Sequence, residues 1–184
     1  MSLDQQKTKM EFHPLYLLFA IIMWILVVCW MLVIFSLSAE TGDVSAARSQ
    51  EVVEKLAKVL GDLAEEGLMR KAAHIFEYLI LSVLAYIAMF ATKHIQSDVN
   101  WSDSKLIQLK SDNEIYIAFA LWITAFGAVA DEYHQIFVPG RSASLFDVLL
   151  DLSGACVLML IIRIIVSIHV YVKDKKSPAE MQIS

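Results

Sequence analysis

The chain has 184 residues, of which 58% are hydrophobic and 19% are charged. Soluble domains are typically about 45 to 50% apolar and about 25% charged, so this composition does not suit a domain surrounded by water. The formal net charge is -5, and no basic run precedes the C-terminal tail. Nucleic acid is therefore not an expected partner, and we expect a protein embedded in a membrane.

The first predicted element is a transmembrane helix over residues 15–37. This stretch has 23 residues and no charge, and at about 1.5 Å per residue it is long enough to cross a hydrocarbon core of about 30 Å. The apolar core of a cleaved signal peptide spans only about 7 to 15 residues, so we expect the helix to be retained. It contains Cys29, and Cys156 also lies among apolar residues. We expect both to be packed free thiols.

Residues 45–66 are predicted to form an amphipathic helix. Val52, Leu56, Val59 and Leu63 repeat at helical spacing and form one apolar stripe. Two placements fit this pattern. The helix lies on the membrane surface, or it packs its stripe over the bundle as a cap.

Three further membrane spans are predicted over residues 72–91, 115–138 and 145–172. Each is apolar over most of its length and polar at one end only. The polar stretch 93–114 has no clear periodicity and is predicted to be a loop. The pair Pro139-Gly140 closes the third span, because both residues break helices and favour turns.

The predicted fold is an all-α, polytopic membrane bundle of about four transmembrane helices, with the amphipathic helix in the first outer loop. We expect residues 1–184 to form a single membrane domain. An even number of spans places both termini on one side. Nine of the 15 lysines and arginines fall on that side and six on the other. Because basic residues concentrate in cytoplasmic loops, we expect the termini in the cytoplasm.

The polar ends of the three later spans should lie on one face of the membrane. Successive spans alternate in direction, so the start of the second, the end of the third and the start of the fourth meet opposite the termini. A carboxylate exposed to lipid there would cost several kcal/mol, so these side chains should turn toward one another or toward a cavity. The candidate ligand-binding residues are Arg70, Lys71, His74, Glu77, Asp131, Glu132, His134, Gln135, Arg141, Ser144, Asp147 and Asp151.

Two interpretations of this cluster remain open. It could be a buried network of salt bridges that fixes the register of the helices, or it could be a functional site. The cations Arg70, Lys71 and Arg141 do not balance the five carboxylates among the candidates. Protonated histidines, a bound cation or a protonated carboxylate could each supply the missing charge, and each is typical of a functional site.

Asp147 and Asp151 are one helical turn apart on the same face, where two ionised carboxylates would repel each other. We expect a cation beside Asp147 and partial protonation of Asp151, which lies deeper. Arg141, six residues before Asp147, is one expected source of that cation. Alternatively, Arg141 pairs with Asp131, or it binds a phosphate or carboxylate of a headgroup, since it lies on a turn with free backbone amides.

Other chemistries fit the pattern less well. Six residues could donate nitrogen and oxygen ligands to a divalent metal: His74, Glu77, Asp131, His134, Asp147 and Asp151. However, no H-E-x-x-H motif is present, and no metal or other cofactor is expected. Ser144 could form a triad with histidine and aspartate. However, the chain has no G-x-S-x-G motif, and a serine before a helix is more often its N-cap.

The same residues carry a family resemblance. The runs RKAAHIFEY (70–78), DEYHQIFVPGR (131–141) and SLFDVLLDLSG (144–154) resemble the VanZ-like family of small bacterial membrane proteins, and FSLSAET after the first span resembles that family's motif at this place. The resemblance covers about residues 35–160. It implies a protein of the bacterial cytoplasmic membrane.

The resemblance also implies a phenotype rather than a reaction. The family's namesake is associated with tolerance of teicoplanin, a glycopeptide antibiotic. This antibiotic acts on cell-wall precursors at the outer face of the bacterial membrane. One interpretation is a non-enzymatic envelope protein that binds a lipid headgroup, a lipid-linked cell-wall precursor or an envelope protein. The other is an intramembrane enzyme that uses Lys71, His74, Glu77, Asp131 and Glu132 for acid/base chemistry on an envelope lipid.

Overall fold

The computed structural model describes residues 10–48, 50–51, 66–98 and 105–180. Four long helices make up most of this part: α1 (Pro14–Ser38), α3 (Glu66–Lys93), α4 (Lys105–Gln135) and α5 (Leu145–Glu180). Residues 42–48 and 50–51 are also helical. The predicted all-α bundle with four membrane helices is therefore confirmed. It carries one addition, a short antiparallel pair of strands, β1 (Met10–Phe12) and β2 (Gln96–Asp98).

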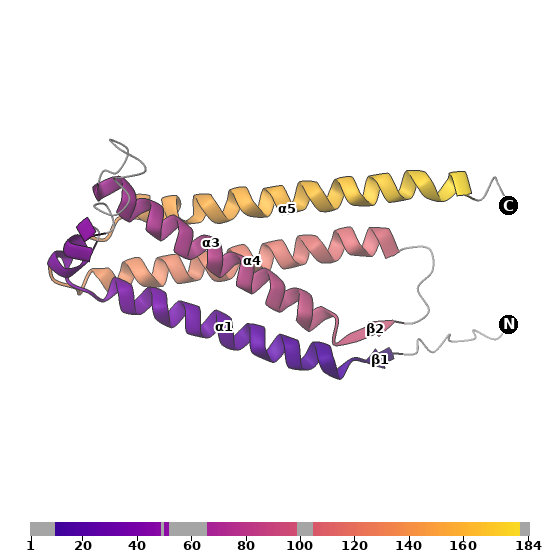
Figure 1. The fold of residues 1–184 in the computed structure, drawn as a ribbon, viewed down its shortest axis with the longest axis horizontal. Coiled ribbons are helices and arrows are strands. Elements are labelled where there is room, and N and C mark those ends of the chain that lie inside the picture. The colour runs from indigo at the N-terminus through magenta and orange to yellow at the C-terminus, as the bar shows by residue number, and fades with distance from the viewer. Residues whose placement is uncertain (1–9, 49, 52–65, 99–104, 181–184) are drawn as a thin grey trace, which may run out of the picture.

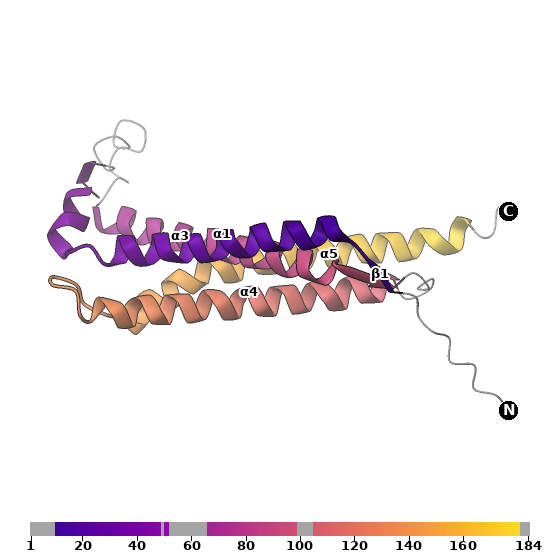
Figure 2. The ribbon, with the colours of Figure 1, turned by 90° about the horizontal axis from the view of Figure 1, so that it is seen from below.

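The four helices lie side by side and alternate in direction (Figures 1 and 2). The start of α1, the end of α3, the start of α4 and the end of α5 share one end of the bundle with the two strands, and we call it the terminal end. The opposite end, where α1 and α4 end and α3 and α5 begin, is called the site end. Both ends of the described chain lie at the terminal end, as an even number of spans requires.

Helix α3 is the centre of the packing, since it packs extensively against α1, α4 and α5, whereas α4 has few contacts with α1. Its buried face carries Tyr78, Leu81, Ala85 and Ala88, all completely buried. Small residues on the neighbouring helices let the backbones approach this face. A Cβ on Gly154 would lie 2.5 Å from Cγ2 of Ile75. Close packing of small residues is a main source of helix association in membranes, where lipid tails are as apolar as the helix surfaces.

The outer surface of the bundle is apolar. Four helices in the described part of the chain are long and apolar enough to cross a membrane. Only 22% of the most apolar stretch of α1 is buried within the protein. Cys29 and Cys156 are free and exposed on this surface. The expectation that these thiols are packed is therefore wrong, because both residues occupy the outward faces of their helices.

Several boundaries differ from the prediction. Helix α3 begins at Glu66, α4 begins at Lys105 and α5 continues to Glu180, while α4 ends at Gln135, three residues before the predicted end of its span. The loop predicted over 93–114 is therefore wrong for its second half. Polar side chains there are paired across the bundle, as in the ion pair of Arg163 and Glu114 at 2.7 Å, so the helix extends beyond its apolar stretch.

The predicted amphipathic helix over 45–66 is described in the structure only near its two ends. Residues 45–48 and 50–51 are helical, whereas 52–65 lie outside the described residues. Glu66 belongs to α3. The placement of the apolar stripe stays a prediction.

Candidate functional site

The segment after α1 is joined to the turn after α4 at the site end. The Gly42 N–H donates to the carbonyl oxygen of Pro139 at 3.1 Å. A Cβ on Gly42 would lie 2.9 Å from the carbonyl carbon of Gly140 and closer still to its oxygen. Gly140 itself has φ +76°, a conformation that L side chains rarely adopt. Glycine at both positions allows the two backbones to touch.

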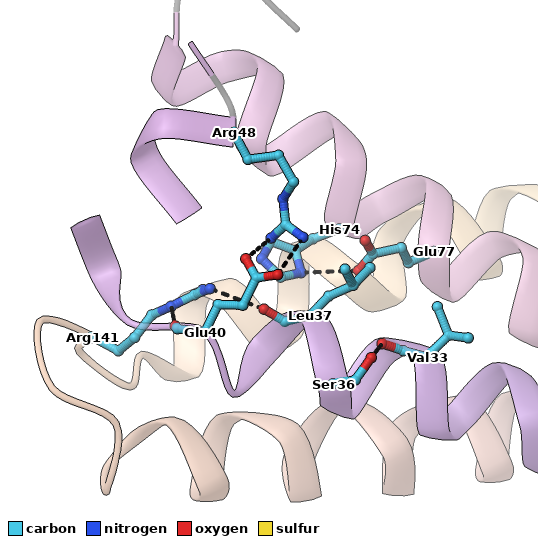
Figure 3. A network of polar contacts seen from close by, with 8 residues as sticks. All are labelled: Val33, Ser36, Leu37, Glu40, Arg48, His74, Glu77 and Arg141. Atoms are coloured by element: carbon cyan, nitrogen blue, oxygen red, sulfur yellow. Dashed lines mark hydrogen bonds and ion pairs between the residues drawn. The ribbon is translucent and has the colours of Figure 1, made fainter. Parts of the chain in front are cut away.

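Arg141 holds the end of α1. Its Nε donates to the carbonyl oxygen of Glu40 at 3.2 Å, and its Nη2 donates to that of Leu37 at 3.3 Å (Figure 3). Carbonyls at a helix C-terminus have no intrahelical partner and carry partial negative charge, so a cation is favourable there. Arg141 forms no ion pair with Asp131 or Asp147 among the described contacts. Where the sequence predicted such a pair, the described side-chain contacts of Arg141 are to the end of α1.

Glu40 and Arg48 form a second polar contact on this segment. The guanidinium binds both carboxylate oxygens, with Nη1 2.9 Å from Oε1 and Nη2 2.6 Å from Oε2. In Figure 3 Arg48 approaches the Glu40 carboxylate, while Arg141 contacts the main chain beside it. The side chain of Arg48 is 41% exposed and that of Glu40 is 30% exposed. This ion pair links two positions of the segment after α1, and neither of its residues lines the cavity described below.

A group of half-buried and buried polar side chains lies on α3 and α4 near the site end. Nδ1 of His74 lies 3.4 Å from Oε2 of Glu77. Asp131 is only 1% exposed and accepts a hydrogen bond from Nε2 of Gln135 at 3.0 Å. The Ser38 hydroxyl, from the last residue of α1, is next to the same carboxylate. The His74–Glu77 contact lies within α3 and the Gln135–Asp131 hydrogen bond within α4, while Ser38 brings the end of α1 to the α4 carboxylate.

The start of α5 is capped and tied to α4. The Ser144 N–H donates to Oε2 of Glu132 at 2.8 Å, and the Ser144 hydroxyl accepts the Phe146 N–H at 3.2 Å. The hydroxyl therefore has the position of an N-cap, which satisfies a free amide of the first helical turn. Of the two alternatives for this serine, the geometry supports the cap.

A cavity of about 100 Å³ opens among these elements at the site end. Asp151 lines it, is only 4% exposed, and forms no hydrogen bond or ion pair with any described residue. Asp147 lines it one turn nearer the helix start and is equally unpaired among the described residues. The described residues that line it are Lys71, His74, Glu132, Gln135, Gly140, Arg141, Ser142, Asp147, Leu150 and Asp151. The cavity can therefore accept hydrogen bonds from a bound group.

A comparison with protein families matches the VanZ/LLP1 model to residues 23–166, which include every residue of the cavity. The chain belongs to the VanZ/LLP1 family. The predicted resemblance is thereby confirmed, and the chain is a multi-pass membrane protein of that family. No curated protein and no solved structure matches the chain.

The structure brings most of the predicted site residues of this family member together. Seven of the twelve line the cavity: Lys71, His74, Glu132, Gln135, Arg141, Asp147 and Asp151. Glu77 and Asp131 lie behind it in the α3 and α4 group, and Ser144 caps α5. His134 is exposed on the surface of α4. Arg70 belongs to α3, but its side chain lies outside the described part of the chain.

Among the described residues of the site end, the predicted set lacks Ser38, Glu40 and Arg48 and also the cavity-lining residues Gly140, Ser142 and Leu150. The signal was available, because α1 ends on the same side as the polar ends of the other spans. Ser38 and Glu40 also lie in the FSLSAET run. As for metals, no group of three or more histidine, cysteine, aspartate or glutamate side chains lies close enough to hold an ion within the described ranges.

Proposed function

We propose that this VanZ/LLP1 family member is a non-enzymatic protein of the bacterial cytoplasmic membrane that binds the headgroup of a membrane lipid or of a lipid-linked cell-wall precursor. The termini face the cytoplasm, so the cavity opens toward the outer surface. A volume of about 100 Å³ suits part of a headgroup. Cavities that enclose drug-sized ligands are larger, about 300 to 1,000 Å³.

The observation that carries this proposal is the state of Asp151. Its carboxylate is almost fully buried, borders the cavity and has no described hydrogen-bond or ion-pair partner. Burial of a charged group without a partner is costly, and a bound group that donates hydrogen bonds would offset that cost. A buried network of salt bridges alone does not account for an unpaired carboxylate at a cavity wall.

The geometry supports binding better than acid/base catalysis. Of the five residues of the enzyme hypothesis, Glu77 and Asp131 do not line the cavity. One oxygen of Glu132 is occupied by the Ser144 amide. A general acid or base must come within about 2.6 to 3.2 Å of the proton that it transfers, directly or through one water. Two of the candidate carboxylates would have to act from behind the cavity wall.

Lipid mass spectrometry of the protein purified in mild detergent tests the proposal. The wild type should retain a lipid, and Asp151→Asn should retain much less of it, because the amide keeps the shape and removes the charge. Asp112→Asn is the matched control. Asp112 pairs with Lys93 at the terminal end, 3.5 Å away, and its variant should retain the wild-type amount. Equal retention by Asp151→Asn and the wild type would overturn the proposal.

We further propose that headgroup binding at the outer surface alters tolerance of teicoplanin-type glycopeptides. In a strain in which deletion of the gene lowers tolerance, wild type and Asp112→Asn should restore it and Asp151→Asn should not. Restoration by an Asp151→Asn protein that accumulates normally would separate the cavity from the phenotype.

A further inference from the structure

Among the described residues that line the cavity, carboxylates outnumber fixed cations, and this imbalance indicates the class of ligand. Three carboxylates line the cavity, those of Glu132, Asp147 and Asp151. Among the described residues two fixed cations line it as well, Lys71 and Arg141, and the guanidinium of Arg141 also donates to the carbonyls of Leu37 and Glu40. Lys71 is exposed. The inner part of the cavity therefore presents more negative charge than its own cations neutralise.

His74, the remaining titratable residue of the lining, does not change this balance. Its Nδ1 lies 3.4 Å from Oε2 of Glu77, a carboxylate behind the cavity. If the imidazole is charged, it interacts with Glu77 and also with Asp151. With His74 and Glu77 included, four carboxylates still exceed three cations among the described residues.

These carboxylates match the hydrogen-bonding capacity of an ammonium group. A primary ammonium has three donors and no acceptor, whereas an ionised carboxylate only accepts. Asp147 and Asp151 have no described hydrogen-bond partner, and Glu132 uses only Oε2 for the Ser144 amide. A phosphate or another anion would be repelled by the same three groups.

The lining also distinguishes a primary from a quaternary ammonium. Quaternary ammonium groups are recognised by the faces of aromatic rings and cannot donate hydrogen bonds. Among the described residues, no phenylalanine, tyrosine or tryptophan lines the cavity; the ring centroid of Phe146 lies 5.8 Å from Nζ of Lys71, but Phe146 is not part of the lining. The volume of about 100 Å³ has room for an aminoethyl group.

We propose that the cavity binds the primary ammonium of an aminoethyl phosphate headgroup, with the ammonium between Glu132, Asp147 and Asp151 and the phosphate at the mouth near Lys71. This inference rests on the proposed function, because it identifies the class of headgroup held in that cavity. It assigns the ligand class to zwitterionic aminophospholipids rather than to anionic or choline lipids.

Native mass spectrometry of the delipidated full chain tests the inference. The protein in mild detergent is titrated with dioleoyl phosphatidylethanolamine, phosphatidylcholine and phosphatidylglycerol. We expect the ethanolamine lipid to bind at least about tenfold more tightly than the other two. The double variant Asp147→Asn/Asp151→Asn should lose this preference, whereas Asp112→Asn should keep it. The comparison of lipids on the wild type needs no variant and remains informative if the double variant does not fold.

Soluble O-phosphoethanolamine distinguishes the two sources of this chemistry. Competition with the lipid assigns recognition to the headgroup alone, and absence of competition assigns it to the membrane-embedded lipid. Equal binding of all three lipids that still depends on the two aspartates would overturn the ammonium inference and leave the proposed function intact. If no lipid binds in a manner that depends on them, both fail.

Discussion

Gly42→Ala tests whether the close contact between the segment after α1 and the turn after α4 supports the cavity. The added methyl group would overlap the main chain of Gly140, 2.9 Å from its carbonyl carbon and closer to its oxygen, whereas ordinary contact begins at 3.4 Å. The clash is with backbone, so a change of side-chain rotamer cannot relieve it. The two segments must separate by about 1 Å.

This separation sets the expected loss of stability. Three described hydrogen bonds join the segments: Gly42 to Pro139 at 3.1 Å, and Arg141 to Glu40 and Leu37 at 3.2 and 3.3 Å. Lengthened by about 1 Å, they would no longer form, and each contributes about 1 kcal/mol net. Alanine also restricts the unfolded chain, which returns about 0.4 to 1 kcal/mol. We therefore expect the free energy of unfolding to fall by about 2 to 3 kcal/mol.

Chemical unfolding in mild detergent, followed by tryptophan fluorescence, measures this loss. Ala39→Ser is the matched control, because it also adds one heavy atom but at an exposed position, and it should change the free energy of unfolding by less than about 0.5 kcal/mol. Gly140 and Arg141 line the cavity, so Gly42→Ala should also weaken lipid binding although Gly42 does not line it. A Gly42→Ala protein as stable as the control would refute the reasoning.

Three further predictions concern the orientation of the chain and two individual contacts. In a protein with Cys29 and Cys156 replaced by alanine, single cysteines replace the exposed Gln50 or the exposed Lys175. A membrane-impermeant maleimide applied to intact cells should label the cysteine at position 50 but not the one at position 175. The reverse pattern would place the termini outside. Ser144→Ala should lower the free energy of unfolding by about 1 kcal/mol through loss of the α5 cap and leave lipid binding unchanged; weaker binding would show that the hydroxyl contacts the ligand. Glu114→Gln should cost less than about 1 kcal/mol, because its ion pair with Arg163 is largely exposed; a loss above about 2 kcal/mol would contradict this, and lipid binding should stay at the wild-type level.

The order and direction of the membrane helices could be predicted from the sequence because lipid imposes strict requirements. An uncharged stretch of more than about 20 residues satisfies its backbone only as a helix, so the prediction for 15–37 agrees with α1 (Pro14–Ser38) within one residue at each end. The start of the fourth span at Leu145 was predicted from the turn before it, and α5 begins there. Alternation of the spans then placed the polar ends together without knowledge of any contact.

The partners of the polar side chains were decided only by the tertiary structure. Arg141 contacts the main chain of Glu40, 101 residues away, and not the aspartate six residues after it. Such a choice depends on the rotation of each helix about its axis and on where α1 ends relative to the turn after α4. Helix α1 is apolar all round, so its sequence does not show which face is buried, and the exposure of Cys29 could not be predicted.

The sequence by itself determined a bundle of four membrane helices with its charges gathered at one end, because the cost of polar groups in lipid acts on every residue independently of its neighbours. It did not determine which of those charges remain unpaired. That depends on competition among several acceptors for each donor, and the competition is decided by distances between helices. In the tertiary structure, Arg141 donates hydrogen bonds to the end of α1, and the Ser144 amide donates one to Glu132. Asp147 and Asp151 line the cavity.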